Sequence, residues 1–244
     1  KHSSTVGVTN LLPSFMGTHL EKEIKALEYV LNNPNKPVAA IIGGSKVSTK
    51  IDVINFLLKK MDIIIIGGAM ANTFVAAKGL DVGKSLFEKE CIDLAKELIE
   101  KSQNNNCNLI LPNDFIVSKN LKKNAEYTTA NFDSLPHNMM ALDIGPKSIE
   151  LINKNINNCK TILWNGPLGA FETYPFDKGT NKVASYVSSL TKQKKILSVA
   201  GGGDTVSALN NAKVLNDFSY VSTAGGAFLE WLEGKVLPGI EPIS

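Results

Sequence analysis

The segment Val38-Ala39-Ala40-Ile41-Ile42-Gly43-Gly44-Ser45-Lys46 joins five apolar residues to a glycine pair. Such a continuous apolar run is typical of a strand buried on both faces, as in a parallel sheet. Further apolar runs end in the same way, at Ile65-Ile66-Gly67-Gly68, Val199-Ala200-Gly201-Gly202-Gly203-Asp204 and Val221-Ser222-Thr223-Ala224-Gly225-Gly226. Because the carboxyl ends of parallel strands share one edge, these glycine turns should converge. Glycine allows close backbone approach and helix N-termini attract anions, so this edge is predicted to hold phosphate.

The alternation of apolar runs with helical patterns predicts an α/β fold with a doubly wound, Rossmann-like parallel sheet of about six strands and helices on both faces. The expected strands are Val38–Ile42, Asp62–Ile66, Asn108–Leu111, Met140–Ile144, Thr161–Trp164, Ile196–Ala200 and Ser219–Val221. The expected helices are Val47–Lys60, Leu86–Gln103, Lys147–Asn157, Lys178–Leu190 and Thr205–Asn211. In such a fold, ligands bind beyond the strand carboxyl ends, where the strand order reverses.

The residues ahead of the first strand have a different pattern. Ser4-Thr5-Val6-Gly7-Val8 predicts an isolated strand, which would pair at an edge or in a sheet outside this chain. Thr18 and Glu21 have the spacing of a capping box and lead into an expected helix from Leu20 to Leu31. Farther along, the polar stretch from Ser118 to Pro136 is expected to be the least regular region.

Composition indicates an ordinary globular protein. The 244 residues are 43% hydrophobic and 20% charged, with a net charge of +3, which excludes disordered and disulfide-dense classes. Lysine is spread without a basic run, so nucleic acid is not expected as a partner. Cys91, Cys107 and Cys159 are odd in number and widely spaced, which favours a reduced, cytoplasmic protein. Without a long apolar run or heptad repeat, we expect no membrane contact and a monomer.

Lys46 and Lys50 follow the first glycine pair. The segment matches neither a Walker A loop nor a G-x-G-x-x-G fingerprint. Placed in the first helical turn, as the pattern predicts, both cations would oppose the helix dipole, and an anionic ligand would remove that conflict. The alternative is that both are solvated lysines on an exposed helix.

Asp204 and Thr205 follow the three-glycine turn. Asp204 could be an ordinary helix N-cap, or it could bind Mg²⁺, which typically takes only one or two protein carboxylates beside nucleotide phosphates. The turn from Trp164 to Glu172 combines apolar side chains with a carboxylate. It could hold a purine and a ribose, or be a rigid turn with an exposed glutamate. The pair Gly225-Gly226 could bind an anion or simply allow close strand–helix packing.

Other chemistries have little support in the sequence. His2, His19 and His137 do not have metal-ligand spacing, and no G-x-S-x-G motif is present. Hydrolase activity is therefore not expected. Asp114 and Asp143 are expected just past strands and are interpreted as structural.

Together these segments resemble the C-terminal nucleotide-binding domain of the phosphoglycerate kinase family, from about His2 to Ile240. The resemblance rests on four segments: Gly43-Gly44-Ser45-Lys46-Val47-Ser48-Thr49-Lys50, Trp164-Asn165-Gly166-Pro167-Leu168-Gly169-Ala170-Phe171-Glu172, Gly201-Gly202-Gly203-Asp204-Thr205 and Leu229-Glu230-Trp231-Leu232-Glu233-Gly234-Lys235-Val236-Leu237-Pro238-Gly239. It implies reversible phosphoryl transfer between 1,3-bisphosphoglycerate and Mg-ADP, giving 3-phosphoglycerate and Mg-ATP.

The resemblance also implies roles for single residues. Lys46 matches the lysine that follows the transferring phosphoryl group, Lys50 a lysine that holds nucleotide phosphate, and Asp204 the magnesium ligand. Gly203 and Gly226 match glycines whose N–H groups face the transferred phosphoryl. The other implied nucleotide-binding residues are Gly44, Ser45 and Asn165, with Gly202, Gly203 and Thr205 lining the phosphates, Glu172 at the ribose, and Gly67, Gly68, Leu86, Leu142, Pro167 and Leu168 around the adenine.

Two departures from the family pattern concern the last glycine turn, where Ala224 replaces a glycine and Phe228 a small polar residue. A methyl group at position 224 is tolerable if φ is negative there. The family has two domains and about twice this length, and its N-terminal domain binds phosphoglycerate. We therefore expect residues 1–16 to be a remnant of that domain and linker, residues 17–36 an interdomain helix, and residues 37–244 the nucleotide-binding domain.

Three functions remain open at this point. The chain could be the nucleotide half of a phosphoglycerate kinase that acts only with its other half. It could instead be an ATP- or ADP-binding module that catalyses nothing by itself. A nicotinamide-binding dehydrogenase domain would share the fold but needs a glycine spacing that this sequence lacks.

Overall fold

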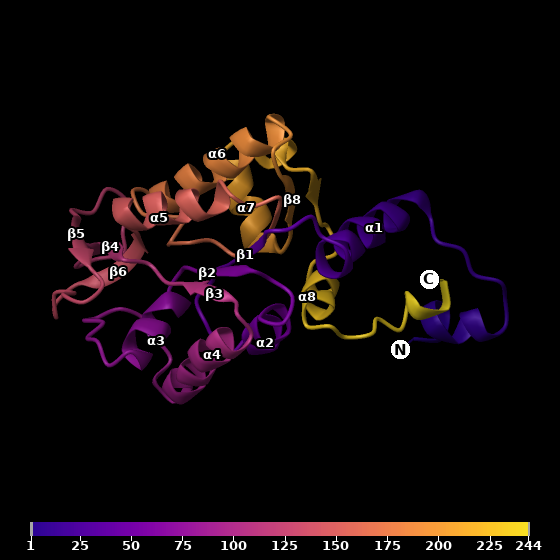
Figure 1. Ribbon diagram of the computed structural model, residues 1–244, viewed down its shortest axis with the longest axis horizontal. Helices are drawn as coiled ribbons and strands as arrows, with labels where there is room; N and C mark the ends of the chain where they lie inside the picture. The colour runs from indigo at the N-terminus through magenta and orange to yellow at the C-terminus, as the bar shows by residue number, and fades with distance from the viewer. Residues whose placement is uncertain (1, 244) are drawn as a thin grey trace.

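The computed structural model describes residues 2–243 and is centred on a six-stranded parallel sheet (Figure 1). The strand order is β3-β2-β1-β7-β8-β9, and every neighbouring pair is parallel. The strands are β1 (Val38–Ile42), β2 (Ile63–Ile66), β3 (Asn108–Ile110), β7 (Thr161–Asn165), β8 (Leu197–Ala200) and β9 (Tyr220–Val221). The order reverses between β1 and β7, so the predicted doubly wound α/β fold is confirmed and the ligand edge is expected beyond Ile42 and Asn165.

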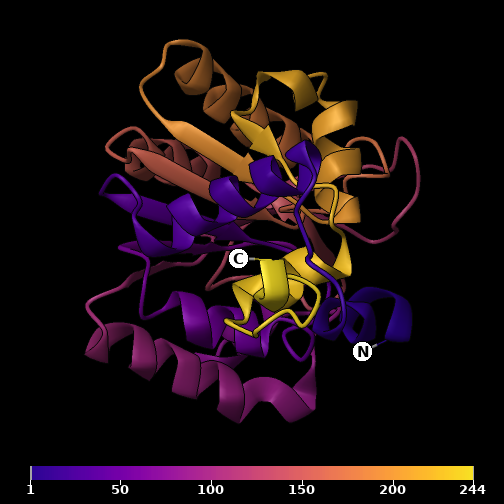
Figure 2. The same ribbon diagram turned by 90° about the vertical axis from the view of Figure 1, so that its right-hand side faces the viewer.

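Helices cover both faces of this sheet (Figures 1 and 2). They are α1 (Thr18–Asn32), α2 (Ile51–Leu57), α3 (Met70–Ala77), α4 (Ile92–Asn104), α5 (Pro146–Ile156), α6 (Lys178–Lys192), α7 (Gly203–Asn211) and α8 (Gly226–Leu232). Side chains alternate along a strand, so Ala40 and Ile42 enter one core with α1 to α4 and α8, while Ala39 and Ile41 enter the other with α5 to α7. This two-sided burial explains why β1 and β2 are apolar at every position.

A separate antiparallel sheet corrects one prediction. Met140–Ile144 forms β6 as expected, but β6 pairs with β4 (Asp114–Ser118), which also pairs with β5 (Thr128–Asn131). The apolar pattern predicts β6 in the main sheet and gives no signal for β4 or β5. A short apolar run alone does not say which sheet it joins, and β5 is largely exposed, so its residues carry a weak apolar signal.

The N-terminal segment also differs from its prediction. Ser3–Gly7 forms a π-helical turn, followed by a 3₁₀ turn over Val8–Asn10, so the expected strand from Ser4 to Val8 is wrong. Its backbone bonds locally, with Val6 N donating to His2 O at 2.9 Å, because no strand lies beside it among residues 2–243. The predicted capping box is also wrong, since α1 starts at Thr18 with Gly17 as its N-cap and no side chain of the described residues caps it.

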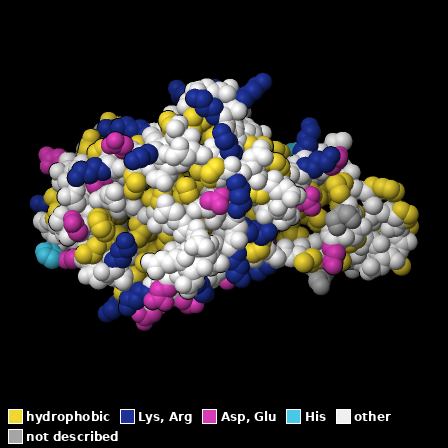
Figure 3. Space-filling model, in the orientation of Figure 1, with side chains coloured by type: hydrophobic (Ala, Val, Ile, Leu, Met, Phe, Trp, Pro, Cys, Tyr) yellow, Lys and Arg dark blue, Asp and Glu magenta, His cyan; other side chains and the backbone are white. Residues whose placement is uncertain are grey.

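The two ends of the described chain lie side by side, apart from the sheet (Figures 1 and 2). Hydrophobic side chains are visible on this end of the surface (Figure 3), and Leu11 and Phe15 are 83% and 87% exposed. Basic side chains on the same view are scattered rather than gathered in one patch. The division into residues 1–16, 17–36 and 37–244 stays a prediction.

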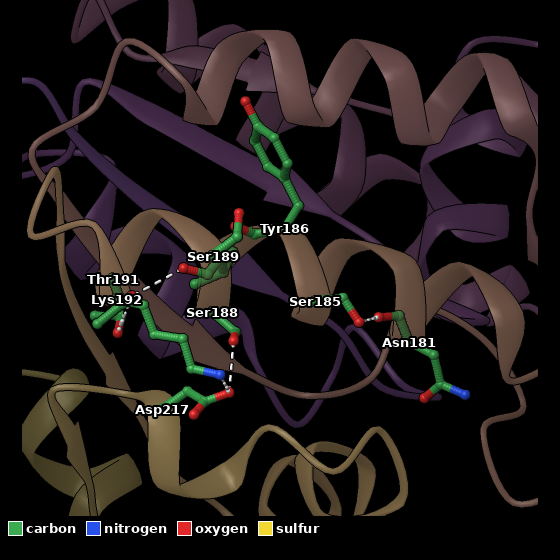
Figure 4. Close-up of polar contacts among 10 residues, drawn as sticks. Asn181, Ser185, Tyr186, Ser188, Ser189, Thr191, Lys192 and Asp217 are labelled. Atoms are coloured by element: carbon green, nitrogen blue, oxygen red, sulfur yellow. Dashed lines mark hydrogen bonds and ion pairs between the residues drawn. The ribbon is translucent and has the colours of Figure 1, made fainter.

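Polar contacts fix α6 (Figure 4). Ser188 Oγ donates to Asp217 Oδ2 at 2.6 Å, and Lys192 Nζ lies 2.9 Å from the same oxygen. The hydrogen bond from Ser188, with Lys192 beside it, lowers the pKa of the Asp217 carboxyl. These contacts attach α6 to the 3₁₀ turn Leu215–Asp217 that leads to β9.

The remaining described elements are the 3₁₀ turns Lys89–Cys91 and Glu241–Ile243. The helix expected from Leu86 begins only at Ile92, after the first of these turns. Across residues 2–243, none of the helices has the length and apolar character needed to span a membrane. All three cysteines are buried, and within the described part of the chain none forms a disulfide.

Candidate functional site

A cavity of about 360 Å³ opens at the carboxyl edge of the parallel sheet. From the glycine turns, the predicted residues Gly44, Ser45 and Gly68 line it. The predicted apolar walls are also present, as Leu86, Leu142, Pro167 and Leu168. Glu172 and Asp204 contribute carboxylates, and both side chains belong to exposed residues. The other predicted residues lie outside the lining: Lys46, Lys50, Gly67, Asn165, Gly202, Gly203, Thr205 and Gly226.

The turns after β1, β2 and β7 are hydrogen-bonded to one another. Gly44 N donates to Pro167 O at 3.2 Å, and Gly68 N donates to Leu168 O at 2.9 Å. A Cβ on Gly43 would lie 2.0 Å from Pro167 O, closer than any real contact. Glycine is therefore required because the backbones of neighbouring turns touch. The convergence predicted for the turns after β1 and β2 is confirmed, and the turn after β7 joins them.

The lysine loop, residues 44–50, does not have its predicted helical form. The helix α2 begins at Ile51, and Lys50 N instead closes a turn on Val47 O at 2.8 Å. Thr49 Oγ1 also donates to Lys46 O at 3.0 Å, a local side-chain bond that competes with a helix start. The placement of both lysines in a first helical turn is therefore wrong. Lys46 is exposed in the loop, whereas Lys50 is half-buried at its end.

Lys50 is connected to the edge of the sheet by a hydrogen bond to Asn165. Its Nζ donates to Asn165 Oδ1, and Asn165 Nδ2 donates to Gly201 O at 2.7 Å. Asn165 is only 2% exposed, so its amide joins Lys50 to the three-glycine turn. Burial lowers the pKa of the Lys50 ammonium, and the charges of Asp204 and Glu233 act against that shift. The interpretation of Lys50 as a freely solvated lysine is wrong.

The three-glycine turn presents Asp204 without using it as a cap. The N-cap of α7 is Gly202 with φ +96°, and no side chain in residues 2–243 caps this helix. The N-cap interpretation of Asp204 is therefore wrong. Thr205 is buried, and its Oγ1 accepts a hydrogen bond from Gly166 N at 2.7 Å, which fixes the turn after β7. Asp204 is left as an exposed carboxylate in the first turn of α7.

The last glycine turn borders open space. A Cβ on Gly225 or Gly226 would meet no heavy atom of residues 2–243 within 4 Å, so close packing does not explain this pair. Ala224 does not have a positive φ, as its methyl group requires. Phe228 is fully buried, and its ring fills the space that a Cβ on Gly201 would need, at 2.7 Å. The two departures from the family pattern are thus accommodated.

Several residues around the cavity were not predicted to be part of it. Asn72 and Phe115 line it from α3 and β4, which the sequence analysis had not identified. Asp143 also lines it, although it has a structural role as well, because its carboxyl accepts from Gly179 N at 2.6 Å and Ile144 N at 2.9 Å. Burial raises the pKa of Asp143 well above its usual range. The sequence signals for it were its place next to Leu142 and its expected position at the end of a strand.

Asp114 is structural, as interpreted. Its side chain accepts hydrogen bonds from Lys147 N and Ser148 N at 3.0 and 2.8 Å, at the start of α5. A carboxylate at that end of a helix is electrostatically favourable. Asp114 therefore anchors α5 rather than a ligand.

The carboxylate of Asp204 suits a metal ion that is also bound by a ligand. Within the described residues, no group of three His, Cys, Asp or Glu side chains is arranged to hold a metal alone. Asp204 is exposed, lines the cavity and is free of capping bonds. One such carboxylate suits Mg²⁺, which completes its octahedral shell with water and phosphate oxygens.

Comparisons with known proteins identify the family. The family model described as phosphoglycerate kinase matches residues 1–235. The phosphoglycerate kinases of Sinorhizobium fredii and Brucella melitensis are 51% and 52% identical to this chain over 240 residues, which is 98% of the chain. The chain spans only 60% and 61% of the length of those two relatives.

Solved structures agree with the sequence comparisons. Phosphoglycerate kinase from Coxiella burnetii is 43% identical, with a TM-score of 0.94, and the match covers 99% of this chain and 62% of that one. The enzyme from Pyrococcus horikoshii is 29% identical, with a TM-score of 0.81, covering 98% of this chain and 60% of that one. Sequence, fold and the turns at the sheet edge thus agree, and the chain belongs to the phosphoglycerate kinase family.

Proposed function

We propose that this chain is the nucleotide-binding part of a phosphoglycerate kinase and that its cavity binds Mg-ADP or Mg-ATP. The observation that carries the proposal is the convergence of glycine turns, apolar walls and the Asp204 carboxylate on one cavity. The reaction would be reversible phosphoryl transfer between 1,3-bisphosphoglycerate and ADP. The phosphoryl group leaves the acyl phosphate oxygen, bonds to the β-phosphate oxygen of ADP, and gives 3-phosphoglycerate and ATP.

The apolar part of the cavity suits the adenine. Leu86 is 61% exposed and lines the cavity, where a flat apolar ring would cover it. Gly68 and Leu168 also line the cavity, and a backbone hydrogen bond holds them together. Glu172 on the same rim would accept hydrogen bonds from the ribose hydroxyls.

The polar part of the edge suits the phosphates. Lys50 would bind nucleotide phosphate, and the exposed Lys46 would follow the transferring group. The backbone N–H groups of Gly203 and Gly226, at the starts of α7 and α8, would face the developing negative charge. Asp204 would hold magnesium, which when bound neutralises phosphate charge. Phosphoryl transfer needs such positioning more than covalent chemistry.

The phosphoglycerate substrate would be bound by residues outside this chain. The chain spans about 60% of the length of its curated relatives, so kinase activity is proposed for a protein in which the rest of that length is present. For the chain as given, we propose nucleotide binding without turnover. Both proposals can be tested separately.

Isothermal titration of this chain with Mg-ADP tests the binding proposal. One saturable site is expected, and a kinase assay of the same sample should show no turnover. Leu168→Asp, which puts a charge into the apolar wall, should abolish binding if circular dichroism shows that the variant is folded. The absence of saturable binding to the unsubstituted chain would contradict the proposal, and turnover by the chain alone would contradict its restriction to binding.

Lys46→Ala tests the catalytic role in a protein that includes the phosphoglycerate-binding part. A charge that acts mainly in the transition state should affect kcat more than KM, and kcat should fall by on the order of 10² or more. Steady-state kinetics would show the difference. A raised KM with unchanged kcat would contradict a catalytic role for Lys46.

A further inference from the structure

Glu88 contacts the lysine loop, although neither the family resemblance nor the sequence motifs assign it a role. Its Oε2 accepts a hydrogen bond from Ser48 N at 3.0 Å, and its Oε1 accepts one from Ser48 Oγ. Ser48 lies midway between Lys46 and Lys50 in the lysine loop. One carboxylate therefore holds the centre of the loop by two hydrogen bonds.

The segment that carries Glu88 is itself fixed to α3. Glu88 N donates to Thr73 Oγ1 at 3.1 Å, and Asn72 Nδ2 donates to Leu86 O at 3.0 Å. The side chains of Asn72 and Thr73 are both buried, so the backbone of residues 86–88 is held by fixed groups of α3. This anchoring uses backbone atoms of the segment and leaves the Glu88 carboxylate for the loop. The same segment presents Leu86 to the cavity.

The charge of Glu88 is favoured at this position. Burial acts to raise the pKa of its carboxyl, but hydrogen bonds from Ser48 and Val47 and the charge of Lys46 outweigh it, so the pKa is lowered. The carboxylate is thus stabilised by the loop that it holds. Hydrogen bonds to an ionised group are the stronger kind.

We propose that Glu88 is a positioning residue that holds the lysine loop in the conformation that binds nucleotide phosphate, by bridging it to the Leu86 wall of the cavity. This inference rests on the proposed function. Because α3 anchors the wall through the backbone, removing the carboxylate should loosen the lysine loop and leave the wall in place. Phosphate binding should then weaken while binding of the base does not.

Glu88→Gln tests this proposal, with Glu90→Gln as the matched control. Glu90 is an exposed residue two positions further on, so its variant has the same change in net charge. Titrations should compare Mg-ADP with adenosine, which has no phosphate. In Glu88→Gln the Kd of Mg-ADP should rise about 3- to 10-fold, which is less than a buried hydrogen bond to a charged group supplies, because the site is partly exposed. The Kd of adenosine, and both values in the control, should stay within about twofold.

A double-mutant cycle identifies the contact responsible. If Glu88 acts through Ser48, then Glu88→Gln and Ser48→Ala should be non-additive in Mg-ADP affinity. Hydrogen exchange provides a readout that needs no ligand, since the amide of Ser48 should exchange faster in Glu88→Gln than in Glu90→Gln.

Four results separate failure of the positioning role, of the contact through Ser48 and of the proposed function. The positioning role would be overturned if Glu88→Gln weakened the binding of Mg-ADP and of adenosine equally. It would also be overturned if Glu88→Gln and Glu90→Gln had the same Kd for Mg-ADP. Additive effects of the two substitutions would overturn the contact through Ser48. Failure of the unsubstituted chain to bind Mg-ADP would instead contradict the proposed function, and the exchange rate would still decide whether Glu88 holds the loop.

Discussion

The glycine at position 43 offers a direct test of how the sheet edge is built. Gly43 is buried between the turns after β1 and β7, where its N donates to Asn165 O at 2.9 Å. In Gly43→Ala, the new Cβ would lie 2.0 Å from Pro167 O and 2.7 Å from Gly166 O. Both contacts are with backbone atoms, which cannot rotate away as a flexible side chain could. The two turns must therefore separate.

The size of the effect follows from these contacts. Overpacking a well-packed site costs about 1–3 kcal/mol, and contacts with backbone atoms belong near the upper end. Separation of the turns also threatens the 3.2 Å hydrogen bond from Gly44 N to Pro167 O, worth about 1 kcal/mol. We expect the free energy of unfolding to fall by about 3 kcal/mol, or roughly 6–12 °C in Tm for a chain of this size.

Urea denaturation followed by circular dichroism measures this loss, with Gly203→Ala as the control. Gly203 begins α7, and a Cβ there would meet no heavy atom of residues 2–243 within 4 Å. The control should be unchanged or stabilised by up to about 1 kcal/mol, because alanine restricts the unfolded chain. The reasoning would be refuted if Gly43→Ala lay within about 0.5 kcal/mol of the unsubstituted protein, the range of ordinary surface changes.

Two further predictions concern single contacts of the site. Thr205→Val removes the acceptor of Gly166 N in a buried position, so urea denaturation should show a loss of about 1–3 kcal/mol, and unchanged stability would contradict this. Burial holds the pKa of Lys50 below its ordinary 10.5, and only its protonated form attracts phosphate, so ADP affinity should fall as pH rises towards that value. Calorimetric titrations across this range should show the fall, which Lys50→Arg should remove; a fall that persists in Lys50→Arg would assign it to another group.

The core of the fold could be predicted from the sequence because strong signals coincide there. The strands Val38–Ile42 and Ile63–Ile66 are apolar at every position, since both faces are buried, and each is followed by a glycine whose Cβ would clash with the turn after β7. The same logic placed Gly44, Gly68 and Asp204 at one edge, where the structure has them. Because the carboxyl ends of parallel strands share one edge, turns that are far apart in the sequence form one site.

The remaining parts depend on contacts that local patterns do not encode. The lysine loop is kept out of α2 by its own turn and by Glu88, which is 40 residues away from Ser48 in the sequence. Met140–Ile144 has the composition of a strand, but its partner β4 was not recognised, so its sheet was assigned wrongly. The strand expected at Ser4–Val8 would need a partner strand, and among residues 2–243 it has none and forms turns. Position in the sequence alone could not reveal these partners.

The central claim is that the sheet edge binds a magnesium nucleotide through Asp204. Calorimetry of Asp204→Asn with Mg-ADP, and with ADP in the presence of a chelator, tests it most directly. Asp93→Asn is a suitable control, since Asp93 is also exposed in the first turn of a helix. Loss of a charge next to the metal should lower the affinity for Mg-ADP about tenfold or more. Free ADP should bind equally or slightly more tightly, because a charge that repels its phosphates is gone. Equal weakening in both conditions, or no change in either, would contradict the account.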